Sequence, residues 1–429
     1  MKQTQHSATG ARRDHVTGSL ADGVDQLIVS DTWSDLRNSR EAPEIDVDRL
    51  RAYRTSRLRA EIERAQVGLL ILINPLSLRY ALDYEGYALF QAHIPETYLF
   101  YPADGPTVLH GASGPPPTTV DEVRAARPLA FFDAGPQQDE ASRLLAEDVV
   151  GFLDQIGCVN RRVAIEFVNP SLTQALLRCG LEVIDGIPIA EAARVIKNSD
   201  EVACMRWAIA VAEHGMAKMR EILRPGVTEV QLWGLLTYTN IANHGFWHDG
   251  RMLASGPRTN PWLQEASQRR VESGDLVAFD TDMMGPWGYF ADVSRTFHCG
   301  PAKPSLRQKE LYRLAYSEVH TNLELVRPGI SFEEIQELAF DVPEEFREQA
   351  YPCIMHAVGM CDEYPRINYG FRGVNFYNGT LQPGMVICVE SYMGAVGEAD
   401  GVKLEQQVLV TEDGHEMLTS FPFEETLLD

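Results

Sequence analysis

The sequence predicts an α+β protein of two domains, in which a small α/β domain precedes a larger domain built from an antiparallel sheet and flanking helices. Its 429 residues are enough for two hydrophobic cores. Short apolar runs alternate with helical stretches as far as about residue 190. From residue 194 onward, long helical periodicities are joined by strand-like runs that flank turn residues.

Residues 1–45 are predicted to form an N-terminal arm. Most of this segment is polar, rich in Arg, Asp, Ser and Thr, and shows no sustained periodicity. Trp33 is an aromatic residue in this polar company. It is expected either to anchor the arm to the body or to a partner subunit, or to contribute to a ligand site.

The α/β domain is expected over residues 46–190. A helix begins near Asp46, because apolar residues from Leu50 to Ile62 recur on one side of it. Val67–Ile73 predicts a buried strand, and Asn74-Pro75 predicts a turn after it. The alternation continues with strands at Thr97–Tyr101 and Arg162–Phe167 and a helix at Glu140–Ile156.

The larger domain is expected over residues 194–429. Ser199 or Asp200 can cap a long helix, and two further helices are expected after Gly226-Val-Thr and over Ser305–Val326. Four strand-like runs supply the antiparallel sheet: Asp275–Asp282, Tyr289–Phe297, Met385–Ser391 and Leu404–Thr411.

Composition narrows the class of protein. A net charge of −23 argues against nucleic acid and anionic membranes as partners, since both require a basic face. The seven cysteines are odd in number and contain no C-x-x-C pair, which favours a reducing cytoplasm. The longest apolar run, Val67–Ile73, is far shorter than a membrane helix, and the N-terminus lacks the pattern of a signal peptide.

Carboxylates are concentrated in a predicted hairpin. Asp280 and Asp282 would share one face if both lay in a strand, and Asp292 lies on the returning run. Three converging carboxylates repel one another unless cations neutralise them. A divalent metal ion with oxygen ligands is the natural counter-charge.

His356–Ile367 reads H-A-V-G-M-C-D-E-Y-P-R-I and resembles the metal-site segment of the pita-bread metallopeptidases, the family of methionine aminopeptidase, Xaa-Pro dipeptidase and creatinase. The resemblance implies a pita-bread fold for residues 194–429. It also implies a creatinase-like N-terminal domain, for which the stretch Asn74–Tyr80 is typical.

In that family two Asp, one His and two Glu bind two divalent metal ions. By this resemblance Asp292, His356, Glu390 and Glu405 are ligands. The first Asp of the pattern matches either Asp280 or Asp282, and a set of six ligands that includes both is retained.

Three positions differ from the family pattern. Lys403 stands two residues before the last Glu where the peptidases have Arg, and Ala357 follows His356 where Gly is usual. Asp362 precedes Glu363, where the peptidases usually have a histidine. A carboxylate there would oppose the oxyanion of peptide hydrolysis but is suited to accept a proton.

The stretches Phe279–Tyr289 (F-D-T-D-M-x-G-P-x-G-Y), Ser294–Phe297 (S-R-T-F) and His356–Ile367 resemble the DddP-type dimethylsulfoniopropionate lyases. This implies β-elimination to dimethylsulfide and acrylate, with the substrate carboxylate on the metal and Asp362 as general base. Tyr351 is implied as a second catalytic residue, and Tyr351, His356 and Trp33 are the implied substrate-side residues. The resemblance also implies homodimers and iron, although the ligands would accept Mn, Co or Zn.

The sulfonium of such a substrate favours aromatic faces. The available aromatics are Tyr351, Trp33, Tyr80, Tyr84, Tyr87, Phe90 and Trp287. For His244 and His248 a structural role is favoured over catalysis.

Two other functions remain open on the sequence. One is a hydrolase of the same fold acting on Xaa-Pro dipeptides or a cyclic amide such as ectoine, from which Asp362 distinguishes the lyase. The other is a metal-depleted binding protein, which the retained Asp292, His356, Glu390 and Glu405 argue against.

Overall fold

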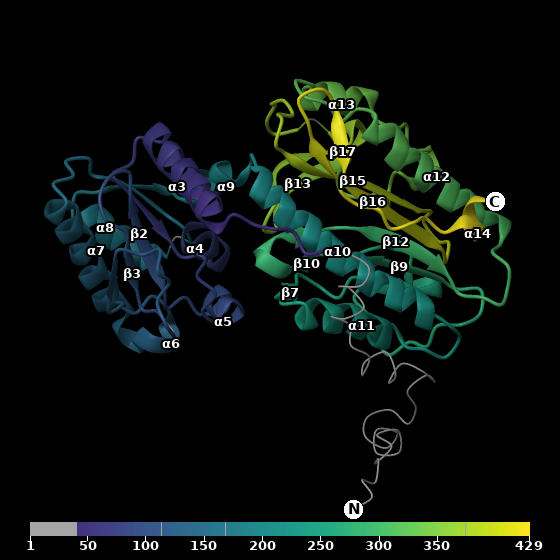
Figure 1. Ribbon diagram of the computed structural model, residues 1–429, viewed down its shortest axis with the longest axis horizontal. Helices are drawn as coiled ribbons and strands as arrows, with labels where there is room; N and C mark the ends of the chain where they lie inside the picture. Colours follow the sequence, from purple (N-terminus) through teal and green to yellow (C-terminus); the bar gives the residue numbers. More distant parts are fainter. Residues whose placement is uncertain (1–40, 113, 168, 374) are drawn as a thin grey trace, which may run out of the picture. The chain divides into compact units, whose positions relative to one another are not determined.

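The computed structural model describes residues 41–112, 114–167, 169–373 and 375–429 (Figure 1). Trp33 and most of the predicted arm lie outside these ranges. The chain divides into two compact units, one of Asp46–Asp200 and one built on Glu201–Asp429. The first unit continues past the expected end at residue 190, because the Arg57 guanidinium of α3 (Val47–Arg64) donates to the carbonyls of Ala192 and Ala193 in α9 (Ile187–Arg194).

The first unit is a six-stranded mixed sheet with helices around it. Strand β1 (Leu69–Leu72) is antiparallel to β2 (Tyr98–Pro102) and parallel to β5 (Arg162–Ile165). The sheet order is β4-β3-β2-β1-β5-β6. The remaining strands are β3 (Val108–His110), β4 (Glu122–Arg124) and β6 (Glu182–Asp185), and the other helices are α4 (Pro75–Leu82), α5 (Ala88–His93), α6 (Phe131–Ala134), α7 (Gln138–Gln155) and α8 (Pro170–Arg178).

The predicted turn at Asn74-Pro75 is instead the start of helix α4. The Asn74 side chain accepts a hydrogen bond from Leu76 N at 3.0 Å, and Pro75 occupies the first helical turn, where its missing N–H costs nothing. A turn and a capped helix start share the same residue types, so the sequence alone did not separate them.

The helices of the second unit begin near the expected signals. Helix α10 (Ser199–Ile222) starts at Ser199 itself, so neither expected cap precedes it, and Asp200 instead pairs with Arg49 at 2.6 Å. Thr228 and Ser305 form capping boxes. The further helices are α11 (Glu229–Ala242), α12 (Leu306–Leu323), α13 (Phe332–Leu338) and α14 (Glu425–Leu428). In the part of the chain that the structure describes, no helix is both long and apolar enough to cross a membrane.

The predicted antiparallel sheet of the second unit is divided into three sheets among the described residues, and every strand pair in them is antiparallel. Their orders are β12-β9-β8, β11-β10-β7 and β14-β13-β15-β16-β17. The strands are β7 (Trp247–His248), β8 (Leu253–Ser255), β9 (Leu276–Asp280), β10 (Met283–Met284), β11 (Phe290–Ala291), β12 (Ser294–His298), β13 (Met355–Val358), β14 (Asp362–Ile367), β15 (Val386–Gly394), β16 (Gly401–Val410) and β17 (His415–Met417).

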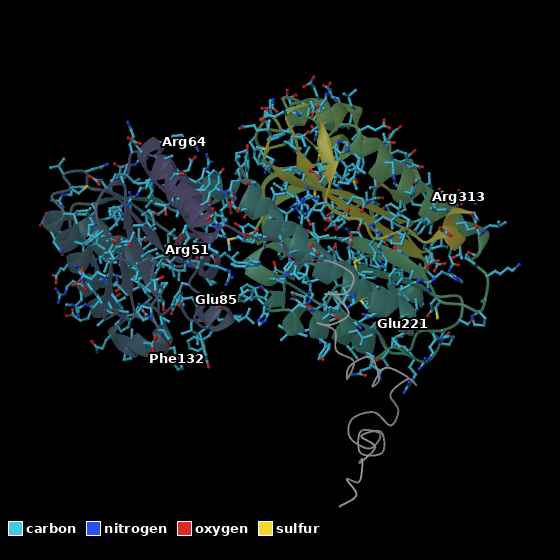
Figure 2. All side chains as sticks on the ribbon, viewed as in Figure 1. Arg51, Arg64, Glu85, Phe132, Glu221 and Arg313 are labelled. Carbon is cyan, nitrogen blue, oxygen red and sulfur yellow. The ribbon has the colours of Figure 1, made fainter. Side chains whose placement is uncertain are left out.

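Side chains join two of these sheets where the functional residues lie. The Thr296 hydroxyl on β12 accepts from Lys403 N and donates to Lys403 O on β16, at 3.0 and 2.9 Å. Helix α12 packs on β15 and β16 (Figure 1). Its outer side carries exposed residues such as Arg313 (Figure 2). The two hydrogen bonds between Thr296 and Lys403 therefore hold the strands of the Asp hairpin against the five-stranded sheet.

Candidate metal and catalytic site

The three aspartates of the predicted hairpin converge. Asp280 is the last residue of β9, and Asp292 lies between β11 and β12. Asp282 lies outside the strands with φ +35°. It therefore does not share a strand face with Asp280, as it would if both residues lay in one strand. One carboxylate oxygen of each of the three nevertheless lies within 4.8 Å of the others. A turn, rather than strand alternation, brings Asp282 to the cluster.

Three neighbouring strands supply the other predicted ligands. Glu390 on β15 lies directly opposite Glu405 on β16. His356 on β13 extends toward both groups, with its Nε2 3.1 Å from Glu390 Oε1 and 3.7 Å from Asp292 Oδ2. His356, Glu390 and Glu405 are buried. Residues separated by more than a hundred positions in the sequence thus meet at one point.

A lysine ammonium lies inside this carboxylate cluster. Lys403 Nζ is 3.0 Å from Asp280 Oδ2, 2.5 Å from Glu390 Oε2 and 3.4 Å from Glu405 Oε2. It also lies 4.4 Å from the centre of the Tyr351 ring. In the sequence Lys403 stands out only because it replaces the Arg of the family pattern. Its position two residues before Glu405 on one strand could have placed it on the ligand face.

The charges in the cluster change the acidity of its members. Burial raises the pKa of Asp292 well above its usual range, and repulsion from Glu405 and Asp280 adds to the effect. Burial acts in the same direction on Asp280, but there the ammonium of Lys403 outweighs it and lowers the pKa. The cluster therefore contains more carboxyl groups than one lysine can balance if all of them are ionised.

The side chains present fit divalent metal ions. Oδ1 of Asp280, Oδ1 of Asp292 and Oε1 of Glu405 are buried and have no hydrogen-bond donor among the described residues. Five carboxylates and one ammonium leave four negative charges, which two divalent cations would balance. Carboxylate oxygens with one imidazole suit Fe²⁺, Mn²⁺, Co²⁺ or Zn²⁺. The set Asp280, Asp282, Asp292, His356, Glu390 and Glu405 can hold the metal.

Asp362 lies beside this cluster and is open to solvent. It is the first residue of β14, its side chain is 67% exposed, and its Oδ1 lies 3.6 Å from His356 Nδ1. The next residue, Glu363, is buried and accepts a hydrogen bond from Met360 N. Strand alternation thus turns Glu363 into the protein and leaves Asp362 exposed to solvent.

Of the candidate substrate-side residues, Tyr351 faces the cluster. Burial raises the pKa of Tyr351 well above 10, so its hydroxyl stays protonated and able to donate. The Asn260 amide donates hydrogen bonds to the carbonyls of Ala395 and Glu398, so it acts structurally. Trp33 lies outside the described residues.

Of the two histidines upstream, His248 is tied to the Asp hairpin. Its Nδ1 lies 2.8 Å from the carbonyl oxygen of Thr281, and burial lowers its pKa to about 4. The neutral ring therefore donates to the backbone between Asp280 and Asp282, which supports the structural role favoured from the sequence. His244 follows α11 with φ +65°.

The aromatic candidates fall into two groups. Tyr80 and Tyr84 are buried in the core of the first unit, where the Tyr80 hydroxyl donates to Ala193 O. Trp287 is 41% exposed in the turn of the Asp hairpin, between β10 and β11. A core position leaves Tyr80 and Tyr84 no face for a ligand.

Comparison with known proteins identifies relatives of this chain. Residues 203–412 match metallopeptidase family M24. The dimethylsulfoniopropionate lyase DddP of Roseovarius nubinhibens is 36% identical over 394 residues, which cover 89% of this chain and 88% of the relative. The protein of the same name from Roseobacter denitrificans is 35% identical over 396 residues, with coverage of 89% and 88%.

Among solved structures, the Xaa-Pro dipeptidase from Bacillus anthracis matches with a TM-score of 0.69 and 21% identity, over 86% of this chain and 98% of that chain. At this level of identity the match concerns the fold. It confirms the predicted fold class, a creatinase-like N-terminal domain followed by a pita-bread domain.

Proposed function

We propose that this chain, which belongs to metallopeptidase family M24, is a metal-dependent lyase that cleaves dimethylsulfoniopropionate to dimethylsulfide and acrylate by β-elimination. The observation that carries the proposal is Asp362. Its solvent-open carboxylate lies 3.6 Å from His356, in the position where the peptidases usually have a histidine. Identity of 36% over 89% of the chain to a lyase of this name supports the same reading.

Two divalent metal ions, which we propose to be iron, would be held by the six ligands named above. When bound, they would withdraw charge from the substrate carboxylate and so make its α-proton more acidic. Lys403 keeps the carboxylates of Asp280, Glu390 and Glu405 gathered around its ammonium. Tyr351 and His356 line the substrate side in this proposal.

Asp362 would carry the proton transfer. Its carboxylate accepts the α-proton as the Cα–H bond breaks, and that electron pair forms the Cα=Cβ double bond. As this double bond forms, the Cβ–S bond breaks, and its electron pair leaves with sulfur as neutral dimethylsulfide. Asp362 then returns its proton to water, which its exposure permits.

The oligomeric state and the arm are part of the same proposal. By resemblance, a homodimer would bring the arm of one subunit, including Trp33, to the site of its partner. Trp33→Ala should then raise the KM for the sulfonium substrate, because an aromatic face contributes about 0.5–2 kcal/mol to cation binding. Light scattering tests the dimer independently of catalysis.

Substitution of Asp362 tests the proposed base. Asp362→Asn keeps the shape of the side chain but removes its basicity, so release of dimethylsulfide should fall by about 10²–10⁴-fold. Headspace gas chromatography measures the release, and elemental analysis should show unchanged metal content. The matched control is Asp249→Asn, since Asp249 is exposed and repels the charge of Asp362 yet has no proposed role.

Each outcome of this experiment is informative. Equal loss in both variants would mean that overall charge matters and that Asp362 is not the base. Loss of metal together with activity in Asp362→Asn would make Asp362 a structural residue or a ligand. If the metal-loaded unaltered protein and both variants release no dimethylsulfide, the lyase proposal is wrong. Xaa-Pro dipeptides and ectoine are then the substrates to test.

A further inference from the structure

A cysteine thiol lies among the metal-ligand side chains. Asp292, His356, Cys388 and Glu405 each offer one ligand atom, and these four atoms all lie within 4.8 Å of one another. All four residues are buried. Cys388 is outside the set of carboxylates and histidine that the family pattern supplies.

The backbone fixes the thiol in this place. Cys388 stands two residues before Glu390 on β15, and alternate residues of a strand point to the same face. It also lies directly opposite His356 in the pairing of β13 with β15. Opposite residues on one face have Cβ atoms about 4.5–5.5 Å apart. The register, and not a chance rotamer, therefore sets Cys388 beside the imidazole.

Unpaired oxygens at the same point indicate a ligand. Oδ1 of Asp292 and Oε1 of Glu405 belong to residues only 2% and 0% exposed, and neither atom has a hydrogen-bond donor among the described residues. The Cys388 sulfur has a long contact of 3.9 Å to the carbonyl oxygen of Asp292. Two buried carboxylate oxygens that lack donors, with a thiol beside them, form a site in which a bound cation would supply the missing counter-charge.

We propose that Cys388 binds a metal ion through its sulfur, at the position shared with Asp292, His356 and Glu405. The thiol loses its proton to solvent as the metal–sulfur bond forms. A mixed sulfur, nitrogen and oxygen donor set prefers Zn²⁺, Co²⁺ and Fe²⁺ to Mn²⁺ and Mg²⁺, because thiolate is a soft ligand. The inference rests on the proposed function only in requiring metal at this cluster.

Cobalt(II) added to the metal-stripped full chain tests the bond without using activity. The unaltered protein should show a sulfur-to-cobalt charge-transfer absorption in the near ultraviolet, and Cys388→Ser should bind cobalt without it. The matched control is Cys299→Ser, because Cys299, which directly follows β12, is equally buried but belongs to neither group of potential ligands. In competition, Cys388→Ser should lose at least about tenfold of the preference for Zn²⁺ over Mn²⁺.

A second measurement needs no variant and so does not depend on how Cys388→Ser folds. X-ray absorption of the zinc-loaded protein should show a sulfur neighbour at about 2.3 Å. Stoichiometric metal with only nitrogen and oxygen neighbours, at about 2.0–2.2 Å, would overturn the inference and leave the lyase proposal standing. A failure to bind any metal at the cluster would overturn both.

Discussion

Lys403 illustrates how one residue shapes the whole cluster. Its ammonium is fully buried and lies within 3.4 Å of three carboxylates. A buried cation among acids stabilises the fold only while its partners remain, and removing one member of such a group leaves charge uncompensated. In the metal-free protein the Lys403 ammonium contacts Asp280, Glu390 and Glu405 together.

We therefore expect Lys403→Met to destabilise the metal-free protein by about 3–5 kcal/mol and the metal-loaded protein by clearly less. Denaturant unfolding with and without a chelator measures the difference. Lys403→Arg keeps the positive charge, so the stability of the metal-free Lys403→Arg variant should lie between that of the unaltered protein and that of Lys403→Met. Equal destabilisation in both states would show that Lys403 acts through packing and not through its charge.

At individual positions the sequence identified the expected metal ligands better than the residues that contact them. Asp292, Glu390 and Glu405 were found by resemblance, and the structure brings them together with His356. The positions of Lys403 and Cys388 were missed, although each stands two residues before a glutamate on the same strand. Strand alternation applied outward from each expected ligand would have found both.

Among the elements, the strands could be predicted but not their register. Apolar runs around Glu390 and Glu405 indicate β15 and β16, whereas the pairing of these two residues depends on where the hairpin turns. Gly394 and Gly401 pair at that end, where an added Cβ would lie 2.5 and 2.2 Å from the Tyr392 hydroxyl. This close approach is a tertiary feature, so no local pattern reveals it.

The sheet of the first unit carries a pH-sensitive element. His110 on β3 is buried and stacks on Tyr98 with ring centres 4.7 Å apart, and burial lowers its pKa to about 4 from an ordinary value of 6.5. The folded protein therefore favours the neutral imidazole more strongly than the unfolded chain does. The contribution of His110 to stability is therefore complete above pH 6.5 and is lost as the pH falls toward 4.

His110→Phe should keep the stacking and flatten this part of the stability curve. The loss that it removes is at most about 1.4 kcal/mol per pH unit. Circular dichroism melts between pH 7 and 4 measure it, with the exposed His93→Phe on α5 as control. The same pH dependence in His110→Phe and in the unaltered protein would rule out His110 as the origin.

For the molecule as a whole, chain length and the order of elements predicted an α/β domain followed by a domain with an antiparallel sheet, whereas the creatinase-like and pita-bread assignments came from the motif resemblance. The boundary between the two domains could be predicted less closely from the sequence. The first unit ends at Asp200, since contacts of α9 and the Arg49–Asp200 ion pair extend it. Such contacts join residues about 150 positions apart and leave no local signal.

Metal removal should act on one unit only. All the proposed ligands lie in the unit built on Glu201–Asp429, and metal at 100 times its Kd would stabilise that unit by about 2.7 kcal/mol. Chelation should then lower its Tm by roughly 5–11 °C in calorimetry. The transition that responds to His110→Phe should not move. A chelator that shifted both transitions equally would contradict the assignment of the metal site.

The product balance of the full-length, iron-loaded protein tests the central claim most directly. Dimethylsulfoniopropionate is supplied beside an Xaa-Pro dipeptide, with dimethylsulfide measured by headspace gas chromatography and acrylate and free proline by liquid chromatography. We expect dimethylsulfide and acrylate in equal amounts and no proline above the level of a metal-free control. Proline release without dimethylsulfide would contradict the elimination and identify the protein as a hydrolase.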